Sequence, residues 1–386
     1  MNHFVCPICG NEDVRYIAYR RDIPYCRKCI SFQGEIANIN YLVDEDEASL
    51  NYELSEEQKN ISAQFLNSFK EGKNTLIHAV CGAGKTEIVY ETISYALKNH
   101  MHVGFATPRK DVVIELLPRF KEAFKSAKIV ALYGGHTHEL HGDIILLTTH
   151  QLFRYHQYFD LLIVDEVDAF PFKGNDTLYN IAIRSVRGHY CFMSATPDET
   201  LIEQFKKNGY SFLQLFVRFH KKPIPVPKLY WSFGLIKYVV LIYKLKKYQK
   251  NKLPCLVFCP TIDMSKKLAK FLSLFCKGGT SVSSKDEKRM QKVQDFKDGK
   301  YHYLCTTSIL ERGVTIKDLQ VIVFRSDHIL YDHYALTQIA GRAGRKLGHE
   351  RGEVIFLGHR IDEEMVKSKK EIEFANTYLS HLFKRN

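Results

Sequence analysis

The chain alternates short apolar runs with longer amphipathic stretches over most of its length. In the first half, runs of strand length lie at residues 75–79, 102–106, 143–147, 161–164 and 191–193. The same rhythm returns in the second half, at residues 255–259, 303–306 and 321–324. Apolar strands that alternate with helices are typical of parallel sheets covered by helices on both faces. The pattern therefore predicts an α/β fold with two sheets, one in each half of the chain.

Two segments do not follow this rhythm. Four of the ten cysteines lie within the first 29 residues. Pro223, Pro225 and Pro227 occupy alternate positions in the middle of the chain, where they exclude a helix interior or a central strand and favour a stiff linker. The predicted organisation is a small N-terminal module over residues 1–45, a first lobe over 46–215, a proline-rich linker over 216–228 and a second lobe over 229–386.

Composition and charge narrow the class of protein. With 45% hydrophobic and 25% charged residues, the chain has a globular composition, which excludes a disordered or collagen-like protein. The 55 basic and 43 acidic residues give a net charge of +12, which favours a polyanionic partner such as nucleic acid or an acidic membrane surface. No apolar run approaches the roughly 20 residues of a membrane span, and the first residues lack a secretion signal. We therefore expect a cytoplasmic protein whose cysteines are thiols or metal ligands.

A phosphate-binding loop is indicated by Ala-Val-Cys-Gly-Ala-Gly-Lys-Thr at residues 79–86, between a strand-like run and a helix-compatible stretch. Small residues let backbone N–H groups close around phosphate oxygens at a helix N-terminus. The residues expected to hold the nucleotide are Gly82, Ala83, Gly84, Lys85 and Thr86. Lys85 would reach the β- and γ-phosphates of ATP, and Thr86 would bind Mg²⁺. A glycine-rich turn without a ligand is the alternative, and the strand-to-helix setting disfavours it.

Two acidic residues follow the apolar run at residues 161–164. The carboxyl end of a parallel strand faces the crevice in which open α/β sheets bind ligands. Asp165 would therefore hold Mg²⁺, and Glu166 would orient and deprotonate the attacking water. A solvated strand end is the alternative, which the preceding phosphate loop disfavours.

These motifs resemble those of superfamily 2 helicases of the DEAD/DEAH-box-like kind, which implies two RecA-like lobes. By this resemblance, Leu54-Ser55-Glu56-Glu57-Gln58 is a Q motif whose Gln58 reads adenine. Residues 79–86 and 165–168 correspond to motifs I and II. Ser194-Ala195-Thr196 corresponds to motif III, in which Ser194 and Thr196 couple hydrolysis to movement. A polar exit from a strand before Pro197 is the alternative for this last segment.

The resemblance continues in the second half. Residues 338–345 resemble motif VI, and Gln338, Arg342 and Arg345 are spaced i, i+4 and i+7, which places them on one helical face. The resemblance implies that Gln338 couples the lobes and that Arg342 and Arg345 are arginine fingers for the γ-phosphate. A basic solvated helix is the alternative. Residues 306–315 resemble motif V, in which Gly313 contacts the nucleotide, although a threonine replaces the aspartate that many relatives carry after the glycine.

Candidate DNA contacts follow several strand-like runs. They are Pro108, Arg109, Gly134, Gly135, Thr149, Thr306 and Thr307, which resemble motifs Ia, Ib, V and the family's glycine pair. Hydroxyls and N–H groups at such positions can bind phosphate oxygens, although plain helix caps are an open alternative. We expect sequence-independent, salt-sensitive binding of a single strand.

The N-terminal cysteines form two Cys-x2-Cys pairs. Cys6, Cys9, Cys26 and Cys29 leave sixteen residues between the pairs, which is the spacing of a tetrahedral four-cysteine zinc ribbon. One structural Zn²⁺ would supply the folding energy that so small a module lacks. Iron or a redox dithiol is the alternative. Whether this zinc module binds DNA or protein stays open.

The arrangement of a cysteine module before these two lobes resembles the competence DNA-uptake ATPase family, ComFA, from end to end. The resemblance implies a DNA-stimulated ATPase that moves incoming single-stranded DNA in natural transformation. It also implies a position at the inner face of the membrane beside the uptake channel, and a phosphoribosyltransferase-like partner. Three alternatives remain: a replication-restart helicase of the PriA type, whose zinc cysteines lie within the second half of its motor, an RNA helicase, and a non-catalytic zinc-ribbon adaptor. Lys85, Glu166 and Arg345 argue against the adaptor.

Overall fold

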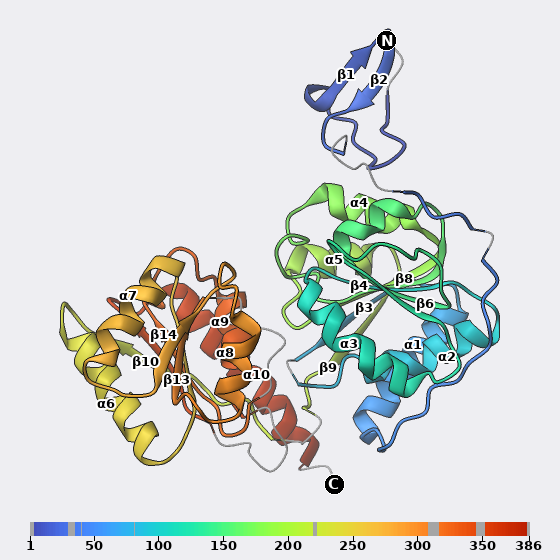
Figure 1. The fold of residues 1–386 in the computed structure, drawn as a ribbon. Coiled ribbons are helices and arrows are strands. Elements are labelled where there is room, and N and C mark those ends of the chain that lie inside the picture. Colours follow the sequence, from blue (N-terminus) through green and yellow to red (C-terminus); the bar gives the residue numbers. More distant parts are fainter. Residues whose placement is uncertain are drawn as a thin grey trace. The chain divides into compact units, whose positions relative to one another are not determined.

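The computed structural model describes residues 4–29, 35–39, 41–80, 82–218, 222–307, 316–344 and 352–383. The chain divides into two compact units (Figure 1). The first comprises Met1–Ala79 and Gly84–Leu215, and the second comprises Phe216–Asn386 together with Val80–Ala83. Among the described residues, none of the helices combines the length and the apolar character that crossing a bilayer requires.

The N-terminal module contains a short hairpin. After a single 3-10 turn, η1 (Val14–Tyr16), the strands β1 (Ile17–Arg20) and β2 (Ile23–Cys26) pair in antiparallel fashion. The two loop residues Arg21 and Asp22 both have positive φ angles, of 49° and 65°. This is the backbone that tight two-residue hairpins adopt, because its twist matches that of the strands. The hairpin therefore brings the two cysteine pairs back toward each other.

A seven-stranded parallel sheet forms the centre of the first unit. Its order is β5 (Ile129–Leu132), β6 (Ile144–Thr148), β4 (Val103–Thr107), β7 (Phe159–Val164), β8 (Val186–Ser194), β3 (Thr75–Ala79) and β9 (Ser211–Leu215). The apolar runs of the first half thus form parallel strands, as the sequence predicts. The sequence pattern missed β5 and β9, which are the two edge strands. Strand β9 includes the polar residues Ser211 and Gln214, which weakens its apolar signal, whereas β5 is an apolar run of only four residues.

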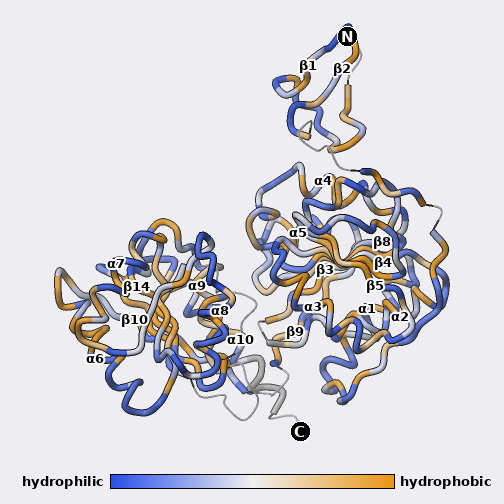
Figure 2. The backbone as a smooth tube through the Cα atoms, in the orientation of Figure 1, coloured by the Kyte–Doolittle hydropathy of each residue, from blue (hydrophilic) through white to orange (hydrophobic). Residues whose placement is uncertain are grey.

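Helices cover both faces of this sheet. In Figure 1, α1 (Glu56–Lys70), α2 (Tyr90–Lys98) and α3 (Lys110–Ala123) lie on one side, and α4 (Asp176–Ser185) and α5 (Glu199–Lys207) lie on the other. Figure 2 shows that hydrophobic residues concentrate along the strands between these layers. Two 3-10 segments, η2 (Glu87–Val89) and η3 (Thr149–Arg154), follow the ends of β3 and β6 in the chain. The three-layer arrangement confirms the predicted α/β fold.

The second unit contains a six-stranded parallel sheet. Its order is β10 (Lys228–Trp231), β15 (Val354–Gly358), β14 (Gln320–Phe324), β11 (Cys255–Phe258), β13 (Tyr303–Thr306) and β12 (Gly279–Val282). The helices of this unit are α6 (Ile236–Lys250), α7 (Ile262–Ser273), α8 (Arg289–Lys297), α9 (His333–Ala340) and α10 (Glu363–Phe383). The sequence pattern identified β11, β13 and β14, which are completely buried. It missed the partly exposed edge strands β10 and β12 and also the completely buried strand β15.

The described part of the proline-rich segment packs within the second unit. The backbone N–H of Ile224 donates to Oδ1 of Asn376 at 2.8 Å, and Nδ2 of Asn376 donates back to the carbonyl of Ile224 at 2.9 Å. The ring of Phe216 meets that of Phe374 edge-on at 6.1 Å. Lys228, the last residue of the predicted linker, is the first residue of β10. Within the described residues of this segment, Phe216 and Ile224 therefore contact α10.

Candidate active site and metal centre

Three predicted nucleotide motifs meet at one edge of the first sheet. The phosphate loop follows β3, Asp165 follows β7, and Ser194 ends β8, and these three strands are neighbours in the order β7, β8, β3. His78 of β3 pairs in register with Ser194 of β8. All three strands are parallel, so their carboxyl ends lie along the same edge. The strand order thus assembles residues that are far apart in the sequence.

The phosphate loop has the backbone that its glycines allow. Gly82 and Gly84 have φ angles of 83° and 78°, in the left-handed region that favours glycine. The N–H of Ala83 donates to the carbonyl of Val80 at 3.1 Å, which closes a tight turn. Cys81 lies outside the described residues. The described part of the loop therefore has the tight turn that is typical of a phosphate-binding loop.

Gln58 is held against this loop by the start of α1. Its side-chain Oε1 accepts a hydrogen bond of 2.9 Å from the N–H of Ser55, while its own N–H donates to Oγ of Ser55 at 3.3 Å. This reciprocal pair is a capping box, which satisfies two N–H groups at the start of the helix. The side chain is 1% exposed. The local sequence Ser-x-x-Gln therefore orients the residue expected to read adenine.

Lys85 and Asp165 form the central charge pair of the site. Nζ of Lys85 lies 3.9 Å from Oδ1 of Asp165, and both side chains are largely buried. Thr86 is also buried. The N–H of Glu166 donates to Oδ1 of Asp165 at 2.8 Å, and Glu166 has a φ of 59°, an uncommon conformation for a non-glycine residue. Such strained residues cluster at functional sites, where the surrounding fold maintains them.

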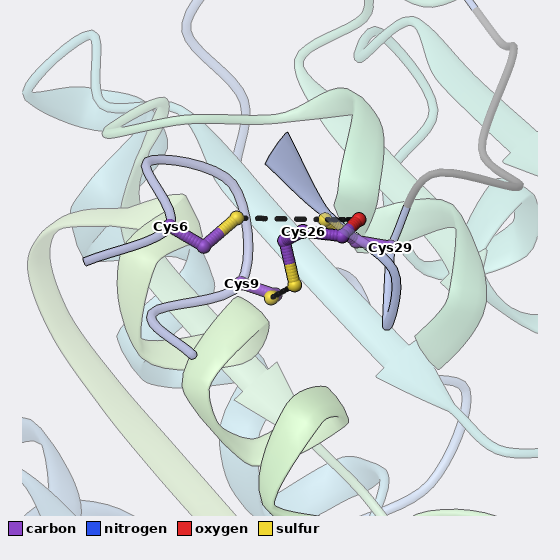
Figure 3. Close-up of side chains that lie close together, drawn as sticks. All are labelled: Cys6, Cys9, Cys26 and Cys29. Atoms are coloured by element: carbon purple, nitrogen blue, oxygen red, sulfur yellow. Dashed lines mark hydrogen bonds between the residues drawn. The ribbon is translucent and has the colours of Figure 1, made fainter. Parts of the chain in front are cut away.

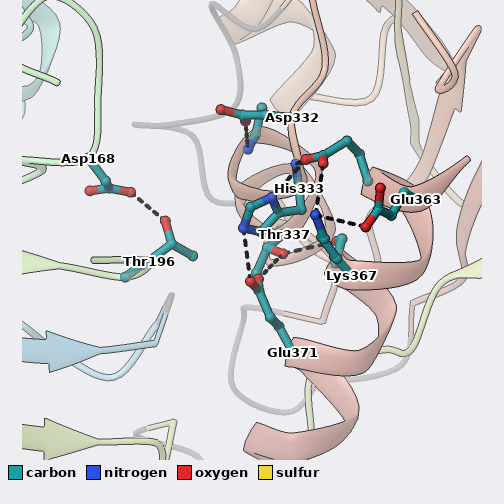
Figure 4. Close-up of polar contacts among 12 residues, drawn as sticks. Asp168, Thr196, Asp332, His333, Thr337, Glu363, Lys367 and Glu371 are labelled. Atoms are coloured by element: carbon teal, nitrogen blue, oxygen red, sulfur yellow. Dashed lines mark hydrogen bonds and ion pairs between the residues drawn. The ribbon is translucent and has the colours of Figure 1, made fainter. Parts of the chain in front are cut away.

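Motifs II and III are joined by a direct hydrogen bond. Oγ1 of Thr196 donates to Oδ2 of Asp168 at 2.7 Å (Figure 4). The N–H of Thr196 also donates to Oγ of Ser194 at 2.9 Å. Nε2 of His78 lies 3.1 Å from the carbonyl of Ala195, and burial lowers the pKa of His78 to about 4, so the neutral ring donates this bond. Motif III is thus fixed both to the acidic motif and to the strand that leads into the phosphate loop.

Sequence reasoning missed a buried carboxylate directly after the phosphate loop. Glu87 accepts a hydrogen bond from the hydroxyl of Tyr52 at 3.0 Å, and Nη2 of Arg119 contacts the same oxygen. Burial, followed by the charge of Glu87, raises the pKa of Tyr52 to about 12. The signal in the sequence was an acidic residue at the start of a helix, which alone indicates only a favourable position for a charge. This network attaches the segment before α1 to the helix that follows the loop.

The predicted DNA contacts of the first unit lie along the other half of the same sheet edge. Pro108 and Arg109 follow β4, Thr149 follows β6, and Gly134 and Gly135 follow β5. These three strands are neighbours in the order β5, β6, β4. The two glycines are exposed, with a φ of 85° at Gly135, and Arg109 is partly exposed. Thr149 is completely buried, and its hydroxyl has no hydrogen-bond partner among the described residues.

The remaining predicted site residues belong to the second unit, and the structure describes only some of them. Thr306 ends β13 with its side chain buried, and Thr307 is partly exposed. Gln338 and Arg342 are each 4% exposed. Helix α9 ends at Ala340, so Gln338 lies within the α-helix and Arg342 lies in the turn that follows it. Gly313 and Arg345 lie outside the described residues.

The four N-terminal cysteines form a buried cluster (Figure 3). Their sulfur atoms all lie within 4.8 Å of one another, with Cys6 and Cys29 at 3.5 Å and Cys9 and Cys26 at 3.6 Å. Four sulfurs around one tetrahedral Zn²⁺ lie about 3.8 Å apart, because each Zn–S bond is about 2.3 Å. Burial raises the pKa of Cys9 to about 11, so its thiolate needs a cation at neutral pH. The cluster is compatible with zinc.

This cluster rests on the first lobe. Nη1 of Arg184, in α4, donates to the carbonyl of Cys6 at 3.0 Å. The cysteines share one buried core cluster with residues of α4 that include Leu178 and Ile181. The cysteine cluster and the first lobe are therefore packed together.

Comparisons with known proteins agree with these observations. Residues 51–199 match the family model "Type III restriction enzyme, res subunit", and residues 236–346 match "Helicase conserved C-terminal domain". The structure of Dbp5 from S. cerevisiae bound to RNA and ADP BeF3 has a TM-score of 0.59 at 16% identity, over 83% of this chain and 91% of that chain. This likeness shows a shared fold of two α/β lobes.

Two curated relatives cover almost the whole chain. The Competence protein ComFA of Bacillus subtilis is 33% identical over an alignment of 405 positions, which covers 96% of this chain and 85% of the relative. That of Streptococcus pneumoniae is 34% identical over 370 residues, which span 91% of this chain and 85% of the relative. With the helicase domains and the assembled nucleotide motifs, these relatives show that the chain belongs to the ComFA family of competence proteins and is an ATP-hydrolysing superfamily 2 helicase-type enzyme.

Proposed function

We propose that this protein is a DNA-stimulated ATPase that translocates along single-stranded DNA taken up during natural transformation. The observation that carries this proposal is the pair of Lys85 and Asp165, 3.9 Å apart beside Glu166, on the same sheet edge as the predicted DNA contacts of the first unit. Nucleotide chemistry and strand contacts would thus share one rigid framework. A change of conformation at the nucleotide site would therefore also change the DNA contacts.

We assign each residue at this edge of the sheet a role in ATP binding or hydrolysis. The backbone of Gly82, Ala83 and Gly84 would surround the phosphates of ATP, while Lys85 would neutralise them. Thr86 and Asp165 would hold Mg²⁺, which polarises the γ-phosphate. Glu166 would orient the attacking water and accept its proton. Gln58 would read adenine, and Gly313 would contact the nucleotide from the second lobe.

The second lobe would complete the site. Arg342 and Arg345 would stabilise the charge that develops on the transferred phosphoryl group, as arginine fingers do. Ser194, Thr196 and Gln338 would couple hydrolysis to movement. Hydrolysis would be gated by closure of the lobes on DNA, because neither half of the site is sufficient alone.

The DNA contacts would be to the backbone. Arg109 and the N–H groups near Pro108, Thr149, Thr306 and Thr307 would bind phosphate oxygens. Gly134 and Gly135, which have no side chain, would let the strand approach the backbone closely. Such contacts do not read bases, and they weaken as salt increases.

The cysteine cluster would hold one structural Zn²⁺ through Cys6, Cys9, Cys26 and Cys29. The proximity of its four sulfur atoms, which all lie within 4.8 Å of one another, supports this assignment. The protein would act in the cytoplasm, at the inner face of the membrane beside the uptake channel. A phosphoribosyltransferase-like competence protein would be its partner.

The proposal is tested by measuring ATP hydrolysis at fixed salt with no polymer, with single-stranded DNA, with duplex DNA and with RNA. We expect the largest stimulation with single-stranded DNA. Stimulation by RNA alone would overturn the DNA assignment and favour an RNA helicase. Absence of hydrolysis in every condition would favour the zinc-ribbon adaptor.

A further inference from the structure

Arg218, in the segment predicted as a linker, is buried against motif VI. The side chain is 2% exposed, although arginine is seldom fully buried. Nη2 donates to the carbonyl of Gly341 at 2.8 Å, and Nη1 donates to the carbonyls of Ala343 and Gly344 at 3.2 and 2.9 Å. These three carbonyls flank Arg342 on both sides in the sequence. The guanidinium of Arg218 therefore binds the backbone on both sides of Arg342, a predicted arginine finger.

The carbonyls need such a donor because α9 ends at Ala340. Beyond it, the N–H groups of Gly341, Arg342 and Ala343 still bond backward, to the carbonyls of Thr337, Ile339 and Ala340. The carbonyls of the last turn have no later helical N–H to accept from. Gly344 has a φ of +60°, at which the chain leaves the helical direction. A cation at this end is favoured by the helix dipole, and the planar guanidinium can serve several acceptors at fixed geometry.

The same helix is braced from its other side by α10. His333 Nδ1 lies 2.7 Å from Oε2 of Glu364, and Oγ1 of Thr337 donates to Oε2 of Glu371 at 2.9 Å (Figure 4). The segment that carries Arg218 is tied to α10 through the bonds between Ile224 and Asn376. Helix α9 is thus held by α10 along its length and by Arg218 at its C-terminal end.

We propose that Arg218 is a positioning residue for the arginine-finger segment, so that the segment predicted as a linker itself sets the place of Arg342. This inference rests on the proposed function, in which both arginines act on the γ-phosphate. Arginine fingers stabilise charge that develops in the transition state. Loss of Arg218 should therefore lower kcat for ATP and leave KM for ATP nearly unchanged.

The test compares Arg218→Lys, Arg342→Lys and the double variant in the full-length protein, with saturating single-stranded DNA. We expect kcat to fall on the order of 10³-fold in Arg342→Lys. In Arg218→Lys it should fall about 10- to 100-fold, the effect of a misplacement near 1 Å, with KM within about twofold of the wild type. The double variant should be no slower than Arg342→Lys, because Arg218 acts through the finger.

The outcomes separate the inference from the function on which it rests. A normal kcat in Arg342→Lys would overturn the arginine-finger role and the inference with it. A reduced kcat in Arg342→Lys with a normal kcat in Arg218→Lys would overturn the inference alone. Multiplicative losses in the double variant would also overturn it, because they would show that Arg218 acts independently of the finger.

A buried arginine also contributes to stability, so folding needs its own control. Arg154, in the first unit, is 8% exposed, and its Nη1 donates to the carbonyl of Glu35 at 2.9 Å. We expect Arg154→Lys to lower the unfolding temperature as Arg218→Lys does and to keep a normal kcat. All kcat values are expressed per site titrated with a fluorescent ATP analogue, so that loss of folded protein is not read as loss of rate. If Arg218→Lys does not fold, Arg218→Gln, which keeps two donors, takes its place under the same criteria.

Discussion

Gly84 lies so close to the side-chain amide of Gln58 that a Cβ added at Gly84 would stand 2.2 Å from Nε2 of Gln58. The phosphate loop and the start of α1 thus fit against each other with no space for a methyl group. The φ of +78° at Gly84 adds a second reason for glycine at this position.

Gly84→Ala should therefore impair nucleotide binding. We expect the dissociation constant of a fluorescent ATP analogue to rise at least about tenfold, which corresponds to about 1.4 kcal/mol. Gly174→Ala is the matched control, because Gly174 has a similar φ of +68° and no atom within 4 Å of an added Cβ. Equal, near-normal binding by both variants would show that Gln58 can move away from the loop.

Glu166→Gln should separate nucleotide binding from turnover. The amide cannot accept the proton of the attacking water, so we expect kcat to fall about 10²- to 10⁴-fold while the dissociation constant for ATP changes less than about threefold. The exposed Glu199 at the start of α5 provides a control in Glu199→Gln, which should hydrolyse ATP normally. Normal turnover by Glu166→Gln would exclude this residue as the base.

Zinc content should depend on the four N-terminal cysteines alone. We expect one zinc per chain in the wild type by mass spectrometry of the metal, and almost none in Cys26→Ser, because three thiolates no longer complete the tetrahedral site. Cys276→Ser, at a buried cysteine of the second unit, should retain the metal. Full zinc retention by Cys26→Ser, or iron in place of zinc, would contradict the assignment.

Arg109→Gln should weaken binding to single-stranded DNA uniformly across sequences. Loss of one phosphate contact should reduce the slope of log affinity against log salt by about 0.7, the value for a single strand. Arg187→Gln is the control, because Arg187 is exposed in the first half of β8, where it pairs with Asp160 at 2.6 Å. A salt slope that is the same in wild type and Arg109→Gln would remove Arg109 from the binding surface.

The free energy of unfolding at acid pH should depend on the protonation of Glu353. Its side chain connects β10 and α6 to the start of β15. Its carboxylate accepts hydrogen bonds from Lys228, Lys244 and Tyr248 at 2.8, 2.9 and 2.6 Å. Burial alone would raise the pKa of Glu353, but these bonds lower it to about 2. Because the folded-state pKa is below the ordinary value of 4.5, the contribution of Glu353 is complete above about pH 4.5 and is lost as the pH falls toward 2.

Glu353→Gln should therefore lower the free energy of unfolding at pH 7 by on the order of 2 kcal/mol and flatten its decline between pH 4.5 and 2. Urea unfolding at a series of pH values measures both effects. Glu373→Gln, at an exposed residue of α10, should change neither. An unchanged pH dependence in Glu353→Gln would show that other carboxyl groups control the decline.

In the first lobe, local sequence predicts the strands before the site residues but not the contacts between distant side chains. The strand-like runs that lead into the phosphate loop and into Asp165 are completely or almost completely buried, and the sequence identified both strands. Ser55 and Gln58, which we interpreted only as part of a Q motif, also form a capping box, a local signal for a helix start that depends on residues three positions apart. By contrast, Glu87, Tyr52 and Arg119 meet only after folding, and no local signal indicates that they contact one another.

The sequence by itself determined the order of the nucleotide motifs, the cysteine spacing and the α/β class, because each depends on backbone geometry and residue chemistry over a few neighbouring positions. Only the tertiary structure decided that β7, β8 and β3 lie side by side, that Asp168 bonds Thr196, and that Arg218 supports the turn around Arg342. Strand order and buried polar contacts are chosen by packing between segments distant in the chain, so no local pattern encodes them.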